Sequence, residues 1–82
     1  MTSRYNSLTE QILGAGIGRV SEVIHLAIDV AKLIGRSDGQ IDQIVVDTIE
    51  DLEAVKAGQD NKSTNTNVEL ALKILLELKG KG

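Results

Sequence analysis

Residues 13–34 read LGAGIGRVSEVIHLAIDVAKLI and place an aliphatic residue or alanine at alternating steps of four and three. The positions on this first stripe are Leu13, Ile17, Val20, Ile24, Ala27, Ala31 and Ile34. Such steps put side chains on one face of an α-helix, and about three heptads are enough to assign the pattern. The stretch therefore predicts a helix that packs against other helices.

A second apolar stripe lies beside the first one. Its members, again three and four residues apart, are Val23, Leu26, Val30 and Leu33. At about 100° per residue the two stripes together cover roughly 200° of the helix, whereas one core-facing side needs little more than 100°. The polar side chains that remain include Glu22, His25, Asp29 and Lys32. We therefore expect this helix to be covered by protein from two directions.

The first predicted helix spans about residues 7–34. Ser7 and Glu10 have the spacing of a capping box, and Gly35 stands where a glycine commonly ends a helix. Each glycine inside a helix costs about 1 kcal/mol relative to alanine. Because glycines stand at 14, 16 and 18, the sequence allows either a continuous helix or a break in Gly14–Gly18.

The second predicted helix spans about residues 38–57, after a capping-box pair at Ser37 and Gln40. Its apolar side is of ordinary width and consists of Ile41, Ile44, Val45, Thr48, Ile49, Leu52 and Val55. Its outer face is acidic and carries Asp42, Asp47, Glu50 and Glu53. We expect only one side of this helix to be buried.

A third helix is predicted at about residues 67–79, after a flexible polar loop at 58–67. The loop contains no apolar residue, and Thr66 with Glu69 has the spacing of a capping box. The helix is apolar over about two-thirds of its circumference, again more than a surface helix requires. This excess of apolar surface also favours burial from more than one side.

The predicted fold is all-α: a three-helix hairpin-type bundle with a long central first helix, formed by one domain at 1–82 and completed by homo-oligomerisation. A compact three-helix monomer is the alternative. An oligomer, a dimer or higher, would cover the apolar surface that the acidic second helix leaves free. The predicted self-association interface consists of Leu13, Ile17, Val20, Val23, Ile24, Ala27, Val30, Ala31, Ile34, Leu72 and Leu75.

Composition narrows the function classes. The 82 residues include no cysteine, so disulfides and thiolate-metal sites are excluded. The net charge of −3 provides no electrostatic footprint for nucleic acid or an anionic membrane. The N-terminus is polar, and charges interrupt the apolar stretch that follows, so we expect no signal peptide and no membrane span. The expected location is cytoplasmic.

Few residues could carry chemistry. Glu22 and His25 have the Glu-x-x-His spacing of di-iron bundles, but they lie on the polar side of the helix, away from both apolar stripes. The glycines of Gly14–Gly18 match no phosphate-binding spacing and favour close helix packing. With one histidine and no cysteine, a nucleophile with an adjacent base is missing. We expect no enzyme activity, no catalytic residue, no metal and no cofactor.

One segment resembles a known motif. Residues 31–44, AKLIGRSDGQIDQI, resemble the helix-turn-helix of repressor-type DNA-binding proteins, with an alanine four residues before the turn glycine and apolar residues six and nine after it. The resemblance extends over residues 27–46 and implies base reading by Ser37, Gln40 and Gln43. Asp38 and Asp42 depart from the motif because their charge would repel phosphates.

The leading hypothesis is a non-enzymatic helical interaction or regulatory protein that self-associates and binds another macromolecule, as an adaptor, regulator or inhibitor. The acidic face of the second helix would suit a protein partner with a basic surface. A helix-turn-helix transcriptional regulator is the alternative. Peripheral membrane binding by amphipathic helices ranks third, because few lysines and arginines flank the apolar side.

Overall fold

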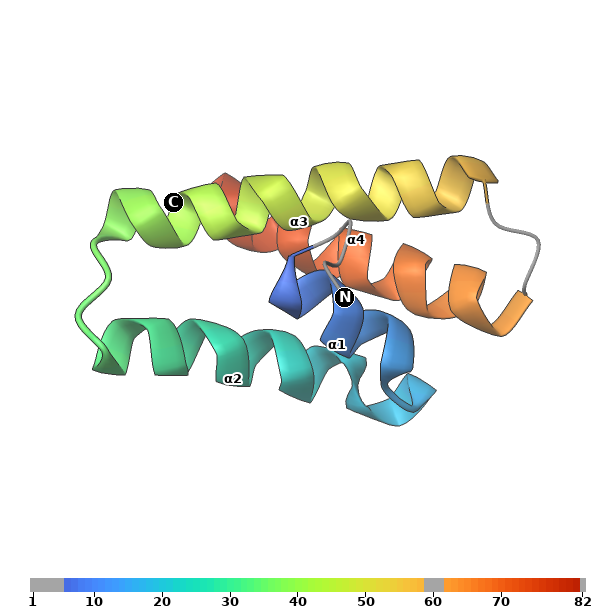
Figure 1. The fold of residues 1–82 in the computed structure, drawn as a ribbon, viewed down its shortest axis with the longest axis horizontal. Coiled ribbons are helices and arrows are strands. Elements are labelled where there is room, and N and C mark those ends of the chain that lie inside the picture. Colours follow the sequence, from blue (N-terminus) through green and yellow to red (C-terminus); the bar gives the residue numbers. More distant parts are fainter. Residues whose placement is uncertain (1–5, 59–61, 82) are drawn as a thin grey trace.

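The computed structural model describes residues 6–58 and 62–81, with side chains at 6–58 and 66–80. These residues form an all-helical fold, in agreement with the predicted class. The chain order is α1 (Ser7–Gly14), a short 3-10 helix η1 (Ile17–Arg19), α2 (Val20–Leu33), α3 (Asp38–Gly58) and α4 (Lys62–Lys81) (Figure 1). Four α-helices thus occupy the described residues where three were predicted.

The predicted first helix at 7–34 is divided, because the chain breaks within Gly14–Gly18, where the sequence allowed a break, and η1 precedes α2. Ala15 and Gly16 are both extended, with ψ of 152°. At the break the side chain of Asn67 donates to two carbonyls, that of the C-cap residue Ala15 and that of Ile12, which also accepts the N–H of Ala15. Its Nδ2 lies 3.3 Å from the Ile12 oxygen and 2.8 Å from the Ala15 oxygen.

The turn between α2 and α3 follows the predicted pattern. Gly35 has a φ of +89°, its N–H donates to the Lys32 carbonyl, and the N–H of Arg36 donates to the Ala31 carbonyl. These two bonds form a Schellman motif, which needs the left-handed conformation that glycine adopts readily. The predicted capping box is confirmed: the N–H of Ser37 donates to Gln40 Oε1, and the N–H of Gln40 donates to Ser37 Oγ.

α1 begins at Ser7, where the first helix was predicted to begin, but the predicted cap is off by one position. Asn6, rather than Ser7, caps α1, because its Oδ1 accepts the N–H of Thr9 over 2.7 Å. Asparagine is as good an N-cap as serine. Ser7 is the first helical residue, and its hydroxyl accepts instead from the exposed Gln11.

The last helix begins earlier than predicted. α4 starts at Lys62, so the predicted loop at 58–67 is wrong for 62–67, and Thr66 lies inside the helix rather than at its N-cap. Residues 59–61 lie outside the described residues. Polar composition does not exclude a helix when packing supports it, and Asn67 and Val68 are both buried.

α4 replaces the first helix as the main packing element. It makes the most extensive contacts of the fold with α3 and substantial ones with α2, whereas α2 and α3 contact each other little. Figure 1 shows α2 and α3 running antiparallel, with α1 and α4 in the space between them. The predicted long central helix is therefore wrong, because α4 and the short α1 separate α2 from α3.

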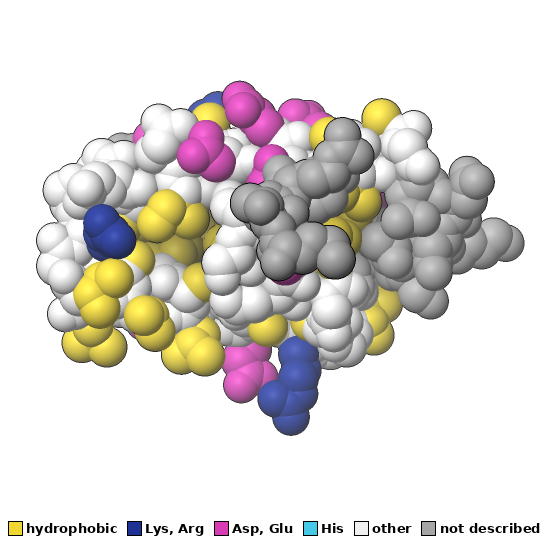
Figure 2. All heavy atoms as spheres, in the orientation of Figure 1, with side chains coloured by type: hydrophobic (Ala, Val, Ile, Leu, Met, Phe, Trp, Pro, Cys, Tyr) yellow, Lys and Arg dark blue, Asp and Glu magenta, His cyan; other side chains and the backbone are white. Residues whose placement is uncertain are grey.

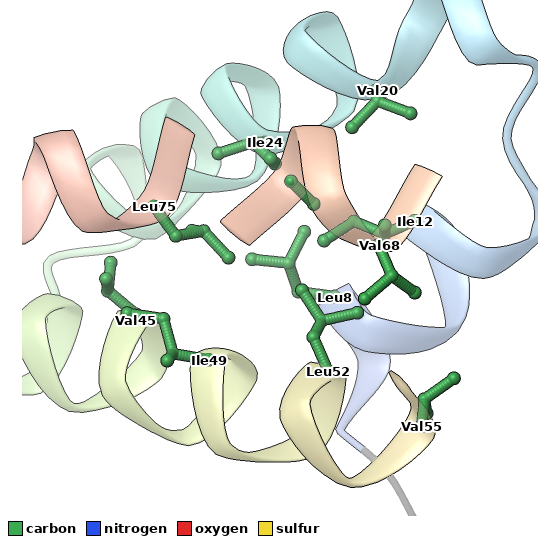
Figure 3. Close-up of a cluster of buried hydrophobic side chains, with 11 residues drawn as sticks. Leu8, Ile12, Val20, Ile24, Val45, Ile49, Leu52, Val55, Val68 and Leu75 are labelled. Carbon is green, nitrogen blue, oxygen red and sulfur yellow. The ribbon is translucent and has the colours of Figure 1, made fainter. Parts of the chain in front are cut away.

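The core draws aliphatic side chains from all four helices, and Figure 3 shows them directed into the space between the helices. Ile12, Ile24, Leu52 and Leu75 are fully buried, one from each helix. The whole cluster is Leu8, Ile12, Val20, Ile24, Val45, Ile49, Leu52, Val55, Val68, Ala71 and Leu75. Burying each larger side chain contributes about 1.5–3 kcal/mol, so this cluster is the main source of stability.

Polar contacts between α1 and α3 supplement the core. Asp51 Oδ2 accepts the N–H of Asn6 and the hydroxyl of Thr9, each over 3.0 Å. The side-chain amide of Asn6 donates to Thr48 Oγ1, whose own hydroxyl donates to the Ile44 carbonyl. Thr9 and Thr48 are fully buried, so this polar cluster fixes α1 on α3.

Candidate interaction surface

Large apolar side chains remain exposed on the C-terminal half of α2 and at its C-cap residue, Ile34. Their exposed fractions are 59% at Leu26, 45% at Val30, 84% at Leu33 and 64% at Ile34. Figure 2 shows hydrophobic side chains gathered over this end of α2, at the lower left of the view. We call these four residues the α2 apolar face. Contiguous exposed apolar patches of this kind mark interaction sites in many proteins.

Helical spacing places this face on the molecule's surface. Leu26, Val30 and Leu33 follow one another at steps of four and three and share one side of α2. Val20 and Ile24, on the other side of the helix, are fully buried. The two stripes of the sequence are therefore divided: the first largely enters the core, and most of the second faces outward.

A groove of about 440 Å³ lies beside the α2 apolar face. Leu26, Val30 and Ile34 belong both to the face and to the groove wall. The remaining lining combines apolar and polar groups from α1, α2, the α2–α3 turn and α3: Asn6, Ser7, Leu8, Gln11, Ala27, Ala31, Arg36, Ile44 and Asp47. The face and the groove thus share three residues and form one continuous surface, to which apolar side chains contribute more than polar ones.

A second hollow of about 510 Å³ lies between α2, α3 and the end of α4. Ile28 and Leu78 contribute apolar lining, and Lys32, Asp38 and Asp42 contribute charge. This lining is more polar than that of the groove. The groove therefore extends the apolar surface, whereas the second hollow does not.

The eleven residues of the predicted self-association interface divide into three groups. Val20, Ile24, Ala31 and Leu75 are buried within the single chain. Leu13, Val23, Ala27 and Leu72 are half-buried. The exposed members are Ile17, Val30 and Ile34. The predicted interface omits Leu26 and Leu33, although the second stripe at three-and-four spacing contained the signal for both.

The three predicted DNA-reading residues are exposed but do not occupy a helix-turn-helix arrangement. Ser37 and Gln40 cap α3, and Gln43 Nε2 donates to Asp47 Oδ1 over 2.8 Å. In the DNA-binding motif the two helices cross at about 90–120°. Here α2 and α3 run antiparallel (Figure 1). The fold therefore adds no support to the DNA-binding alternative.

The charged side chains of α2 make weak local contacts. Arg19 and Glu22 approach to 4.0 Å with both side chains largely exposed, which contributes little stability. The Nδ1–H of His25 donates to the Ser21 carbonyl over 2.8 Å. Within the described residues, no three histidine, cysteine or carboxylate side chains come together to hold a metal ion.

The described helices are also too short or too polar to cross a bilayer. Across the described part of the chain, none has the length and apolar character needed to cross a membrane.

Comparison of the chain with protein-family models, with curated proteins and with solved structures finds no match. The surface chemistry alone therefore supports the function proposed below.

Proposed function

We propose that this chain is a small, non-enzymatic interaction protein that self-associates and binds another macromolecule, as an adaptor, regulator or inhibitor. The observation that carries the proposal is the α2 apolar face, where four large aliphatic side chains are 45–84% exposed beside an apolar groove. Leaving them in water costs free energy that burial recovers, at about 25 cal/mol per Å² of apolar surface. Self-association is the simplest way to cover such a face.

Chain length supports the same proposal. A chain of 82 residues has a small core, and proteins near this size often gain stability by oligomerisation. The buried cluster here contains no aromatic side chain and consists of aliphatic residues. Additional burial at a subunit interface would add to this limited stabilisation.

The outer face of α3 suits a second partner of opposite charge. Asp42, Asp47, Glu50 and Glu53 are all exposed on α3, and Figure 2 shows acidic side chains gathered over this helix. A basic protein surface would complement them and would approach faster at low ionic strength. We therefore assign self-association to α2 and partner binding to the acidic side of α3.

Substitution of one exposed leucine tests the proposal. Leu33→Glu places a charge at the most exposed position of the α2 apolar face and should reduce the mass measured by light scattering from oligomer to monomer. Leu76→Glu is the matched control, because Leu76 on α4 is also a large exposed hydrophobic residue, 54% exposed, outside the face. Equal masses for wild type and Leu33→Glu, both with helical circular dichroism spectra, would contradict the proposal.

A further inference from the structure

We propose that the α2 apolar face is covered by a second copy of the same chain, whose α2 helix packs against it antiparallel around a twofold axis. This inference rests on the proposed self-association and specifies its geometry. The axis passes near residues 28–29, in the middle of the exposed part of α2. Such an interface is isologous, so each contact occurs twice.

The spacing of the apolar residues supports this geometry. Leu26 and Leu33 are seven residues apart and lie on nearly one line along the helix. With the axis near residues 28–29, Leu26 of one copy packs between Val30 and Leu33 of the second copy. Leucine inserted between two aliphatic side chains is the knobs-into-holes contact of paired helices. The face is therefore complementary to itself.

The charges of α2 favour the antiparallel direction. Glu22 lies in the first turn, 4.0 Å from the N-cap residue Arg19, and Lys32 lies in the last turn. Antiparallel packing brings Glu22 of each copy toward Lys32 of the other and opposes the two helix dipoles. Parallel packing would instead place Glu22 beside Glu22 and Lys32 beside Lys32. Both side chains are exposed, so Glu22 would exchange its weak contact with Arg19, and Lys32 its place at the second hollow, for the contact between copies.

Asp29 introduces one unfavourable contact. It is exposed on the flank of α2 next to the proposed axis, so the two copies of Asp29 would approach each other. Repulsion between like charges at this point weakens the dimer. Replacing Asp29 by asparagine should therefore tighten self-association by about 2- to 5-fold, the size expected for one exposed charge contact.

Cross-linking tests the geometry directly, because the wild-type chain has no cysteine. Single-cysteine variants are treated with a short bis-maleimide, and products are identified by mass spectrometry. Val30→Cys should cross-link to itself, since Val30 lies close to the axis. Glu22→Cys alone should not, because about 20 Å along the helix direction separates its two copies at 1.5 Å per residue. Leu76→Cys, outside the face, is the control and should stay uncross-linked.

A mixture of Glu22→Cys and Leu33→Cys completes the test. These two positions lie within about 3 Å of each other along the helix direction across the antiparallel interface, so the mixed product should exceed both self-linked products. Cross-linking of Glu22→Cys to itself, with no mixed product, would overturn the antiparallel geometry.

Two further results separate this inference from the proposed function. A wild-type chain that is monomeric at every concentration would overturn self-association itself. A wild-type oligomer in which Val30→Cys forms no cross-link would leave self-association intact and overturn the assignment of the second copy to α2. In each case a helical circular dichroism spectrum establishes that the variant is folded.

Discussion

Asn67 stabilises the break that separates α1 from α2. Asn67 is 6% exposed, and its side-chain amide donates to the Ala15 carbonyl and to the Ile12 carbonyl, which also accepts the N–H of Ala15. A buried carbonyl without a hydrogen bond costs about 1–3 kcal/mol. The hydrogen bonds of this one polar residue of α4 therefore lower the free-energy cost of the sharp change of direction after α1.

Replacing Asn67 by leucine should lower the free energy of unfolding by about 1–3 kcal/mol, because the Ala15 carbonyl loses its donor and the Ile12 carbonyl keeps only the N–H of Ala15. Urea unfolding followed by circular dichroism measures the change. Gln43→Leu is the control. Gln43 is exposed and hydrogen-bonds only to Asp47, so this substitution should change the free energy of unfolding by no more than about 0.5 kcal/mol. Similar losses for the two variants would show that the Asn67 bonds contribute little.

Substituting alanine for each of the two glycines near the α2–α3 connection should change the stability of the protein in opposite directions. Gly35 has a φ of +89°, so Gly35→Ala should destabilise the protein by about 1–2 kcal/mol. Gly39 lies in the first turn of α3, where an added Cβ would meet only Ser37 Oγ at 4.0 Å. Gly39→Ala should therefore stabilise by up to about 1 kcal/mol. Thermal unfolding of both variants checks the signs, and the same sign for both would contradict this description of the turn.

Residue-level prediction from the sequence succeeds where the interaction is local. The capping pair Ser37 and Gln40 is three residues apart, and Gly35 acts within its own turn. Asn67 was not predictable, because 52 and 55 residues separate it from the carbonyls that it bonds. The side chain of Asn67 can reach these carbonyls only when α4 packs against the end of α1.

At the scale of elements, α1 depends on its neighbours for stability. It has eight residues, and helices shorter than about 12–15 residues are marginal in water when isolated. Leu8 and Ile12 bury it in the core, and the Asp51 carboxylate accepts two hydrogen bonds from its first turn and cap. The polar cluster and these two side chains together hold α1 on the other helices.

Asp51→Ala should weaken α1 selectively. Hydrogen bonds to a charged group contribute about 1.5–3 kcal/mol, which corresponds to tenfold or greater loss of protection for the α1 amides in hydrogen exchange. Asp47→Ala, one turn earlier on α3, is the control, because Asp47 accepts a bond only from exposed Gln43. Unchanged exchange of the α1 amides in Asp51→Ala would contradict the role given to the polar cluster.

Element boundaries were predictable where sequence signals agree. The limits of α3 lie within one residue of the prediction, since the capping box and Gly58 coincide with the ends of its apolar pattern. The break after Gly14 and the start of α4 at Lys62 were not assigned, because glycine content and polar composition allow both a helix and a loop. The burial of Asn67 and Val68 favours both the break after Gly14 and the early start of α4.

At the scale of the whole molecule, one part of the wide apolar surface of α2 is buried in the core and the other part is exposed. Ile24 and Val20 enter the single-chain core, whereas Leu26 and Leu33 stay exposed. The sequence predicted burial from two directions, and α1 and α4 cover α2 within the chain. Which side remained for a partner was not predictable, because it depends on where α1 turns back after the break.

Self-association should also appear in thermal stability. If the folded protein forms a dimer, the unfolding midpoint rises with protein concentration, because association favours the folded state by mass action. Calorimetry over a hundredfold range of concentration measures this rise for the wild type. Leu33→Glu should unfold at the same temperature throughout the range, and a persistent rise in this variant would place the interface elsewhere.

The most direct test of the central claim is the mass of the wild-type chain in solution. Sedimentation equilibrium from about 1 to 200 µM should give a weight-average mass that increases with concentration from the chain mass of 8.8 kDa to at least twice that value. A mass of 8.8 kDa over the whole range would show that the α2 apolar face does not bind a second copy.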